Sequence, residues 1–381
     1  MRAFVWDLAD EGVENVLERL KGNGVDGLHV ALVCHGGRFY CPHNPRHAVI
    51  NAPDGAMYFQ PSLPCYEGLR PRVHPEYGSG AFVGQVGEAL RAYEMQWTAW
   101  VVLLNNLAVS MAHPECTCRN ALGDRLEGAL CPSHPAVRNY AQVLVEDLAH
   151  RVGVDAIELE DFAFMSHENQ IGASWRGITI GPNLGYLLSL CLCEHCRQRA
   201  EEANIDVEDL DRRIEQMIRL GLAGDLSERR ISDEITDPYH PISRFARVRS
   251  ETVTTLLDEL AEAAQGSRAV LQPLLSEEPD DIWRWGIELS ALRERVGGAT
   301  LATGRTASAT QAYLERYIEM LQMNGGLVAD IHLNSPCMSI KGYFETAIEA
   351  CHEAGIRNFV FSPYGLTRLD MLDLIGVLAR R

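Results

Sequence analysis

Acidic side chains alternate with aliphatic ones in two short segments of this chain. In Ala156–Asp161, Glu158 and Glu160 are separated by a leucine, and in Leu327–Asn334 Asp330 stands in the same alternating pattern. Successive side chains of a β-strand point to opposite faces, so these acids would share the face opposite the aliphatic residues. Two carboxyl groups that face one cavity can deliver a proton and attack or activate water, which is the pairing that glycoside hydrolysis requires.

We expect Glu160 and Asp330 to form that pair, with Glu160 as the acid and base. Glu158 would lie deeper and raise the pKa of Glu160 by like-charge repulsion, although a buried ion pair with Arg305 or His29 is the plainer interpretation of Glu158.

Asp161 is the alternative acid, because a strand end is easily misplaced by one residue. The same alternation predicts polar side chains at the same end of other strands. The substrate-binding residues expected from it are Asp7, His35, Asn106, Gln272, Arg305, His332, Asn334 and Tyr364. An unpaired buried polar group costs roughly 1–3 kcal/mol, so a fold would not keep so many at one end for stability alone.

Two other functions remain open at this stage. His35, Glu160, Asp330 and His332 are ligand types for Zn²⁺ or Mn²⁺, and a metal bound there could serve a lyase, an isomerase or a hydrolase. The third interpretation is a carbohydrate-binding protein without catalysis. Tryptophans near the expected site would suit either sugar function, because the C–H faces of sugars stack on aromatic rings.

Six of the eleven cysteines are grouped in two regions of the sequence. Cys191, Cys193 and Cys196 form a C-x-C-x-x-C pattern, and Cys116 of the preceding connection is the expected fourth ligand, with Cys118, Cys131 and His134 as alternatives. Four thiolates of this kind could hold a structural zinc that joins two long loops, and reduced thiols packed against the protein are the alternative. The favoured function itself requires no cofactor.

Short apolar runs alternate with helical patterns along the whole chain, which is typical of parallel strands joined by crossover helices. The expected strands are Ala3–Leu8, Gly27–His35, Trp97–Asn106, Ala156–Asp161, Ala269–Leu274, Ala299–Gly304, Leu327–Asn334 and Asn358–Ser362. Eight such units predict an α/β fold, a single (β/α)₈ TIM barrel over residues 1–381, and an open doubly wound sheet is the alternative.

The connections after strands two, three and four are much longer than the others. They cover about residues 36–80, 107–133 and 162–241. Because the loops that follow the strands of a barrel build its active site, we expect these insertions to form a lid or rim.

Composition narrows the class of partner. The formal net charge of −18 argues against nucleic acid, whose phosphates require clustered Lys and Arg. Neither a signal-peptide core nor an apolar run long enough for a membrane span is present in the sequence, so we expect a cytoplasmic protein. The expected partner is a small-molecule or oligosaccharide substrate, and a homodimer is left open.

Two stretches resemble a family of glycoside-hydrolase-like TIM barrels. Leu130–Tyr140 carries a C-P-x-x-P-x-V-R-x-Y pattern, and Val154–Asp161 follows it as a V-D-x-I-x-L-x-D strand. Cys191–Arg197 is similar to a C-x-C-x-x-C-R element that follows this strand in poorly characterised members. The resemblance covers about a fifth of the chain and implies a catalytic carboxylate at Glu160 or Asp161. This chain departs from the pattern by having Ala156 where glycine is usual, and Glu158-Leu159-Glu160-Asp161 in place of a single aspartate.

Overall fold

The computed structural model of the chain describes residues 1–66, 68–167, 177–303, 307–323, 325–333 and 342–378. Eight parallel strands follow one another in chain order through its central sheet. They are β1 (Arg2–Phe4), β2 (Gly27–Cys34), β7 (Gln96–Val102), β10 (Ala156–Glu160), β11 (Val270–Leu275), β12 (Ala299–Ala302), β13 (Leu327–His332) and β14 (Asn358–Ser362). Each strand pairs in parallel with the next one, from β1 to β14.

Helices separate these strands, as parallel pairing requires a crossover connection. They are α1 (Val5–Glu11), α2 (Val13–Gly22), α3 (Gly80–Ala92), α4 (Leu107–Ala112), α5 (Pro135–Glu146), α6 (Pro182–Ser189), α7 (Glu194–Glu202), α8 (Val207–Ala223), α9 (Glu228–Thr236), α10 (Pro241–Ala263), α11 (Leu289–Leu292), α12 (Ala307–Leu321), α13 (Tyr343–Glu353) and α14 (Leu369–Leu378). Helix α5 continues as a π-helical turn over Asp147–Val152. None of the described helices is both long and apolar enough to cross a membrane.

Local sequence explains where several helices start. Helices α5 and α10 each begin with proline, after a histidine whose side chain accepts a backbone N–H of the first turn. Proline suits this position because its missing N–H would have no partner there. Glycine pairs precede two strands: a Cβ on Gly298 would lie 2.2 Å from the carbonyl oxygen of Gly326. Only glycine permits that approach between the chains that enter β12 and β13.

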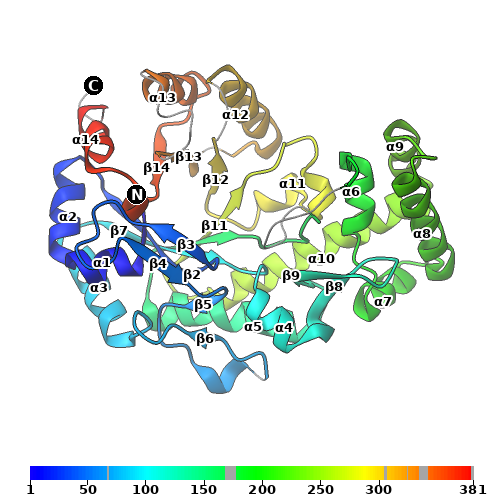
Figure 1. Cartoon of the computed structure of the whole chain (residues 1–381), viewed down its shortest axis with the longest axis horizontal. Helices are drawn as coiled ribbons and strands as arrows, with labels where there is room; N and C mark the ends of the chain where they lie inside the picture. Colours follow the sequence, from blue (N-terminus) through cyan, green and yellow to red (C-terminus); the bar gives the residue numbers. More distant parts are fainter. Residues whose placement is uncertain (67, 168–176, 304–306, 324, 334–341, 379–381) are drawn as a thin grey trace.

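The three longest connections carry elements of their own. Between β2 and β7 lie β3 (Gly37–Tyr40), β4 (Val49–Ala52), β5 (Ala56–Met57) and β6 (Arg72–Val73), and between β7 and β10 lie α4, β8 (Thr117–Arg119), β9 (Arg125–Leu130) and α5. Helices α6 to α10 lie between β10 and β11. In Figure 1, α8 and α9 form the end of the molecule opposite α2 and α14.

The first strand is shorter than the sequence indicated, and the prediction that Asp7 lies on this strand and points into the site was wrong. Strand β1 ends at Phe4, and the run Val5–Glu11 is helical, so Asp7 belongs to α1 and does not extend a strand. A longer β1 would pair with the end of β2, but β5 occupies that position. It pairs antiparallel with Val33 and Cys34 of β2. An apolar run of this length is compatible with either a strand or a buried helix.

Candidate active site

A cavity of about 370 Å³ opens at the carboxyl ends of the parallel strands. Glu160, Ala302 and His332 are the last residues of β10, β12 and β13, and each lines it. The other described residues of its wall are Arg2, Phe4, Trp100, Asp161, Phe162, Ala163, Phe164, Met165, Leu274, Ser276, Glu277, Trp285, Ile287, Asp330, Pro363 and Leu366. Several strands therefore direct polar side chains into one aromatic-walled space.

A buried ion-pair cluster centred on Arg2 forms the floor. The guanidinium donates to both carboxylate oxygens of Glu158, at 2.9 and 2.8 Å, and to Asp330. Glu158 also accepts from Thr300 at 2.7 Å and lies 3.1 Å from His29 Nδ1. The charges of Arg2 and His29 outweigh the effect of burial and hold the pKa of Glu158 below its ordinary value. Glu158 is thus ion-paired, with Arg2 and His29 and not with Arg305.

Glu160 meets two donors at the edge of the cavity. Trp100 Nε1 donates to one carboxylate oxygen at 2.6 Å, and His35 Nε2 lies 3.2 Å from the other. Asp161 follows in a left-handed backbone conformation, with φ of 51°, and accepts from Asn105 Nδ2 at 2.9 Å. One ligand atom from each of His35, Glu160 and Asp161 lies within 4.8 Å of the others.

The pKa values of the neighbouring carboxyls of Glu160 and Asp161 are shifted in opposite directions. Burial alone would raise the pKa of Glu160, but the hydrogen bond and charge of His35 keep it below its ordinary value. Burial and the charge of Glu160 raise the pKa of Asp161 to about 6. For His35, burial is outweighed by the hydrogen bond and charge of Glu160, so that its pKa rises to about 9. The expected rise in the pKa of Glu160 was therefore wrong in direction, because His35 and not Glu158 dominates.

Asp330 and His332 stand two residues apart on β13 and face the same cavity. His332 Nε2 lies 3.1 Å from Asp330 Oδ2, and the imidazole is about half exposed while the carboxylate is 1% exposed. Burial would raise the pKa of Asp330, yet the charge of Arg2 and the hydrogen bond from His332 lower it to about 2. In turn, the hydrogen bond to Asp330 raises the pKa of His332.

Glu277 is a cavity residue that the sequence reasoning missed. It follows β11 by two residues, and burial raises the pKa of its carboxyl, to which the charge of Glu160 adds. Ser276 donates to it through both backbone N–H and hydroxyl. The signal available in the sequence was the acidic pair Glu277-Glu278 immediately after the predicted fifth strand.

Five of the expected substrate-binding residues are absent from the described wall of the cavity, and one of them, His35, reaches it only through its contact with Glu160. Asp7 caps its own helix by accepting the Phe4 N–H, and Asn106 caps α4. Gln272 donates to Thr300 beneath the floor, and Tyr364 contacts Glu11 and Arg19 elsewhere. Each of these other polar groups therefore has a hydrogen-bond partner away from the cavity. Two further expected residues, Arg305 and Asn334, lie outside the described residues.

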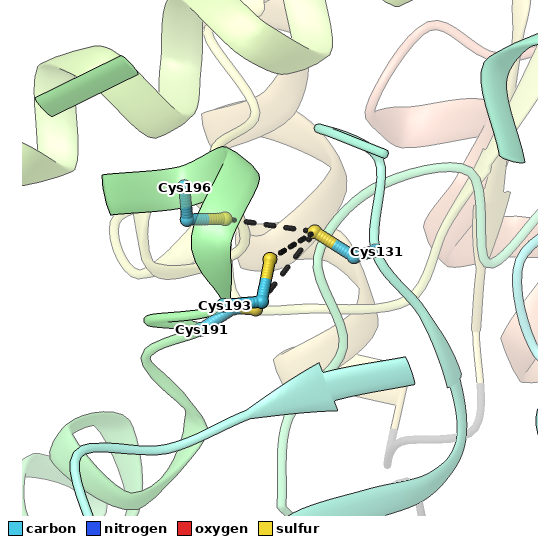
Figure 2. A group of neighbouring side chains, drawn as sticks. All are labelled: Cys131, Cys191, Cys193 and Cys196. Atoms are coloured by element: carbon cyan, nitrogen blue, oxygen red, sulfur yellow. Dashed lines mark hydrogen bonds between the residues drawn. The ribbon is translucent and has the colours of Figure 1, made fainter. Parts of the chain in front are cut away.

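The cysteine pattern assembles into a buried group of four thiols. Cys131 Sγ lies 3.6 Å from Cys193 Sγ, 3.5 Å from Cys196 Sγ and 3.8 Å from Cys191 Sγ. Cys193 immediately precedes α7, and Cys196 lies in its first turn. Figure 2 shows the thiols of both residues directed at Cys131.

The fourth member is Cys131, which the sequence left as an alternative, and not the favoured Cys116. The two residues are neighbours, since the Cys131 N–H donates to the Cys116 carbonyl at 2.8 Å. The side chain of Cys116 turns away from the thiol group and lies 3.7 Å from His134 Nε2. Spacing in sequence does not reveal which of two paired residues turns inward.

The parallel-dominated sheet and its crossover helices are those of a mixed α/β protein, and this fold matches that of glycoside hydrolases. No family model matches the sequence, and no curated protein matches it. The solved structures that it resembles include several glycoside hydrolases.

One of these structures is the glycoside hydrolase domain of PgaB (BpsB) from Bordetella bronchiseptica. It aligns with a TM-score of 0.61 and 11% identity over 98% of this chain and 97% of that one. The catalytic domain of a β-amylase from Paenibacillus polymyxa gives 0.58 and 10%, over 100% and 98%. A β-galactosidase from Marinomonas ef1 gives 0.55 and 9%, over 100% of this chain and 59% of that one. At these identities the likeness shows the fold alone.

Proposed function

We propose that this protein is a glycoside hydrolase-type enzyme that acts on a carbohydrate or glycoside through carboxyl groups at the ends of β10 and β13. The observation that carries the proposal is one aromatic-walled cavity lined by carboxyls of opposite ionisation. Asp161 has a pKa raised to about 6, whereas that of Asp330 is lowered to about 2. Hydrolysis of a glycosidic bond needs one protonated and one ionised carboxyl on either side of the bond.

Spacing decides which carboxyls can work together. Paired glycosidase carboxyls lie about 5–5.5 Å apart in retaining enzymes and about 6.5–9.5 Å in inverting ones. Glu160 and Asp161 offer oxygens within 4.8 Å of each other, closer than either range, so we do not pair them. We assign Asp161 as the proton donor and Asp330 as the ionised partner, with Glu160 as a fixed charge that keeps Asp161 protonated.

The architecture proposed for this site is a closed (β/α)₈ barrel. Its support is the unbroken parallel order of eight strands and the contact of β1 with β14, the first and last of them. The three long connections after β2, β7 and β10 would then surround the mouth as a rim. Phe162, Phe164 and Met165, at the start of the third connection, already line the cavity.

A panel of nitrophenyl glycosides tests the activity. Galactosides, glucosides and fucosides of both anomeric forms would be incubated with the protein, and released nitrophenol would be measured. We expect Asp161→Asn and Asp330→Asn each to lower turnover by orders of magnitude while sugar binding survives. Glu160→Gln would reduce turnover by shifting its pH dependence. Unchanged turnover in both aspartate variants would remove the assigned pair.

A second candidate function is a metal-dependent lyase, isomerase or hydrolase. One histidine and two carboxylates, from His35, Glu160 and Asp161, present oxygen and nitrogen ligand atoms within 4.8 Å at the cavity edge. A divalent cation there would act as a Lewis acid. A chelator would abolish such an activity and spare a metal-free glycosidase. A protein that binds sugars in calorimetry but releases no product would support the third candidate, a carbohydrate-binding barrel.

We also propose that the four thiols of Cys131, Cys191, Cys193 and Cys196 hold a structural zinc. A tetrahedral Zn²⁺ with Zn–S distances near 2.3 Å requires its sulfurs to lie about 3.8 Å apart. The three distances from Cys131 Sγ are 3.5, 3.6 and 3.8 Å, so the thiols fit the ion with little movement. Such a site would join the segment after β9 to the start of α7. Elemental analysis of purified protein tests it, with one zinc per chain expected.

A further inference from the structure

A second pocket, of about 250 Å³, adjoins the first cavity. Met165 and Trp285 line both of them, so the two spaces share a wall. The remaining described residues of the second pocket are Ser166, His167, Ile180, Gly181, Pro182, Gly185, Tyr186, Ser189, Asp281 and Arg284. They belong to α6, to the described segments before it and to the segment before α11, which the proposed catalytic step does not use.

Aromatic rings in this pocket are held rigidly. The ring of Tyr186 packs edge-on against Trp283, with centroids 5.1 Å apart. The guanidinium of Arg249, itself 1% exposed, lies 5.5 Å from the Tyr186 ring, and that of Arg284 lies 5.6 Å from it. A ring fixed between two cations and an indole is preorganised, and Trp285 lines the same pocket.

The polar groups of the pocket are charge-balanced. Arg284 donates from Nε to Asp281 at 2.8 Å and from Nη2 to Asn183 at 2.8 Å, which fixes its position. On the α6 side, the His167 N–H donates to Ser189 Oγ at 2.8 Å. Hydroxyls, an imidazole and a paired arginine between aromatic rings suit the hydroxyl groups and C–H faces of a sugar.

We propose that the second pocket binds a further sugar residue of a neutral oligosaccharide, with Trp285 and Met165 at the boundary between two sugar positions. This inference rests on the proposed function, whose cavity would hold the sugar that is cleaved. The substrate is uncharged because the charges that face both spaces are already paired within the protein, Glu160 with His35, Asp330 with Arg2 and Arg284 with Asp281. The enzyme would therefore discriminate by chain length, favouring an oligosaccharide over a simple glycoside.

The test compares one substitution with a control two residues away. Ile180 is half-buried and lines the second pocket, whereas Ile178 is 46% exposed and is not among its described lining residues. Ile180→Trp would fill the pocket, and Ile178→Trp makes the same change outside it. The substrates are a nitrophenyl monoglycoside that the wild type cleaves and the nitrophenyl di- and trisaccharides of the same sugar.

We expect Ile180→Trp to lower kcat/KM roughly tenfold for the trisaccharide, the size of one lost ring contact, and to leave the monoglycoside nearly unchanged. Ile178→Trp should match the wild type on both substrates. Retained monoglycoside turnover shows that the variant is folded. If wild-type kcat/KM is independent of chain length, or if Ile180→Trp acts equally on both substrates, the inference is wrong while the proposed function stands.

A binding experiment covers the case in which no glycoside is cleaved. Calorimetry would compare maltotetraose, cellotetraose and a galactotetraose with their monosaccharides, and with tetragalacturonate as the charged probe. We expect a neutral tetrasaccharide to bind at least tenfold more tightly than its monosaccharide, and Ile180→Trp to remove that gain. Such a result would sustain the second sugar position although the proposed catalysis had failed. Absence of the gain, or equally tight binding of tetragalacturonate, would overturn it.

Discussion

Removal of the Arg2 guanidinium should destabilise the protein strongly at neutral pH. Arg2 is 2% exposed, and its partners Glu158 and Asp330 are 0% and 1% exposed. Breaking a buried ion pair by removing one member costs about 3–5 kcal/mol, because the remaining charge stays buried without compensation. Glu158 keeps His29 and Thr300, and Asp330 keeps His332, so we expect Arg2→Met to lower the free energy of unfolding by about 3 kcal/mol.

The sign of the pH dependence follows from the lowered pKa values of Glu158 and Asp330. A carboxyl whose pKa is depressed by folding stabilises the protein above its ordinary pKa, and that stabilisation is lost as the pH falls through the folded-state value. Without Arg2 the largest contribution to this depression is lost, and protonation relieves the buried charges. The difference in unfolding free energy between wild type and Arg2→Met should thus be largest near pH 7 and shrink as the pH falls below about 4.5.

Urea unfolding at several pH values, followed by circular dichroism, measures this difference. Arg316→Met is the control, because Arg316 also pairs with two carboxylates, Asp280 and Glu319, but on the exposed surface. We expect that control to change stability little at any pH, since water and salt screen exposed pairs. A loss in Arg2→Met no larger than in Arg316→Met, or one that grows in acid, would refute the reasoning.

Three further predictions concern other parts of the molecule. Gly87→Ala should cost about 1–3 kcal/mol in thermal or urea unfolding, because its Cβ would lie 2.2 Å from a tryptophan ring of β7, whereas Gly84→Ala on the open side of the same helix should cost nothing. Cys131→Ser should lower the bound zinc and the melting temperature, while exposed Cys65→Ser leaves both unchanged. As proton donor with a pKa of about 6, Asp161 should make kcat/KM fall as the pH rises through 6, and Asp161→Asn should remove that limb from the pH–rate profile. Retention of the limb in Asp161→Asn would assign it to another group.

The alternating direction of side chains along a single strand was predictable from sequence, because it depends only on neighbouring residues. The inward positions of Glu158 and Glu160 on β10, and of Asp330 and His332 on β13, follow from the spacing of their aliphatic neighbours. His35 was likewise assigned from its own segment. The cysteine group was predictable for the same reason, since three of its four members share one short pattern.

Strand ends and long-range partners were not predictable in this way. Asp7 was misplaced because an apolar run before it forms a helix once β5 occupies the adjacent edge of β2. Arg2, which pairs with residues 156 and 328 positions away, gave no local signal at all. Glu277 was missed because it follows its strand in a turn, where alternation no longer applies.

The sequence by itself determined the element order, the parallel α/β class and the face on which several acids lie, since each depends on contacts within a few residues. The tertiary structure decided which of those acids differ in ionisation. Glu160 and Asp161 are adjacent in sequence, yet His35, 125 residues from Glu160, lowers the pKa of one, and burial with the neighbouring charge raises that of the other. Ionisation depends on through-space distance and exclusion of water, which exist only after the strands have packed together.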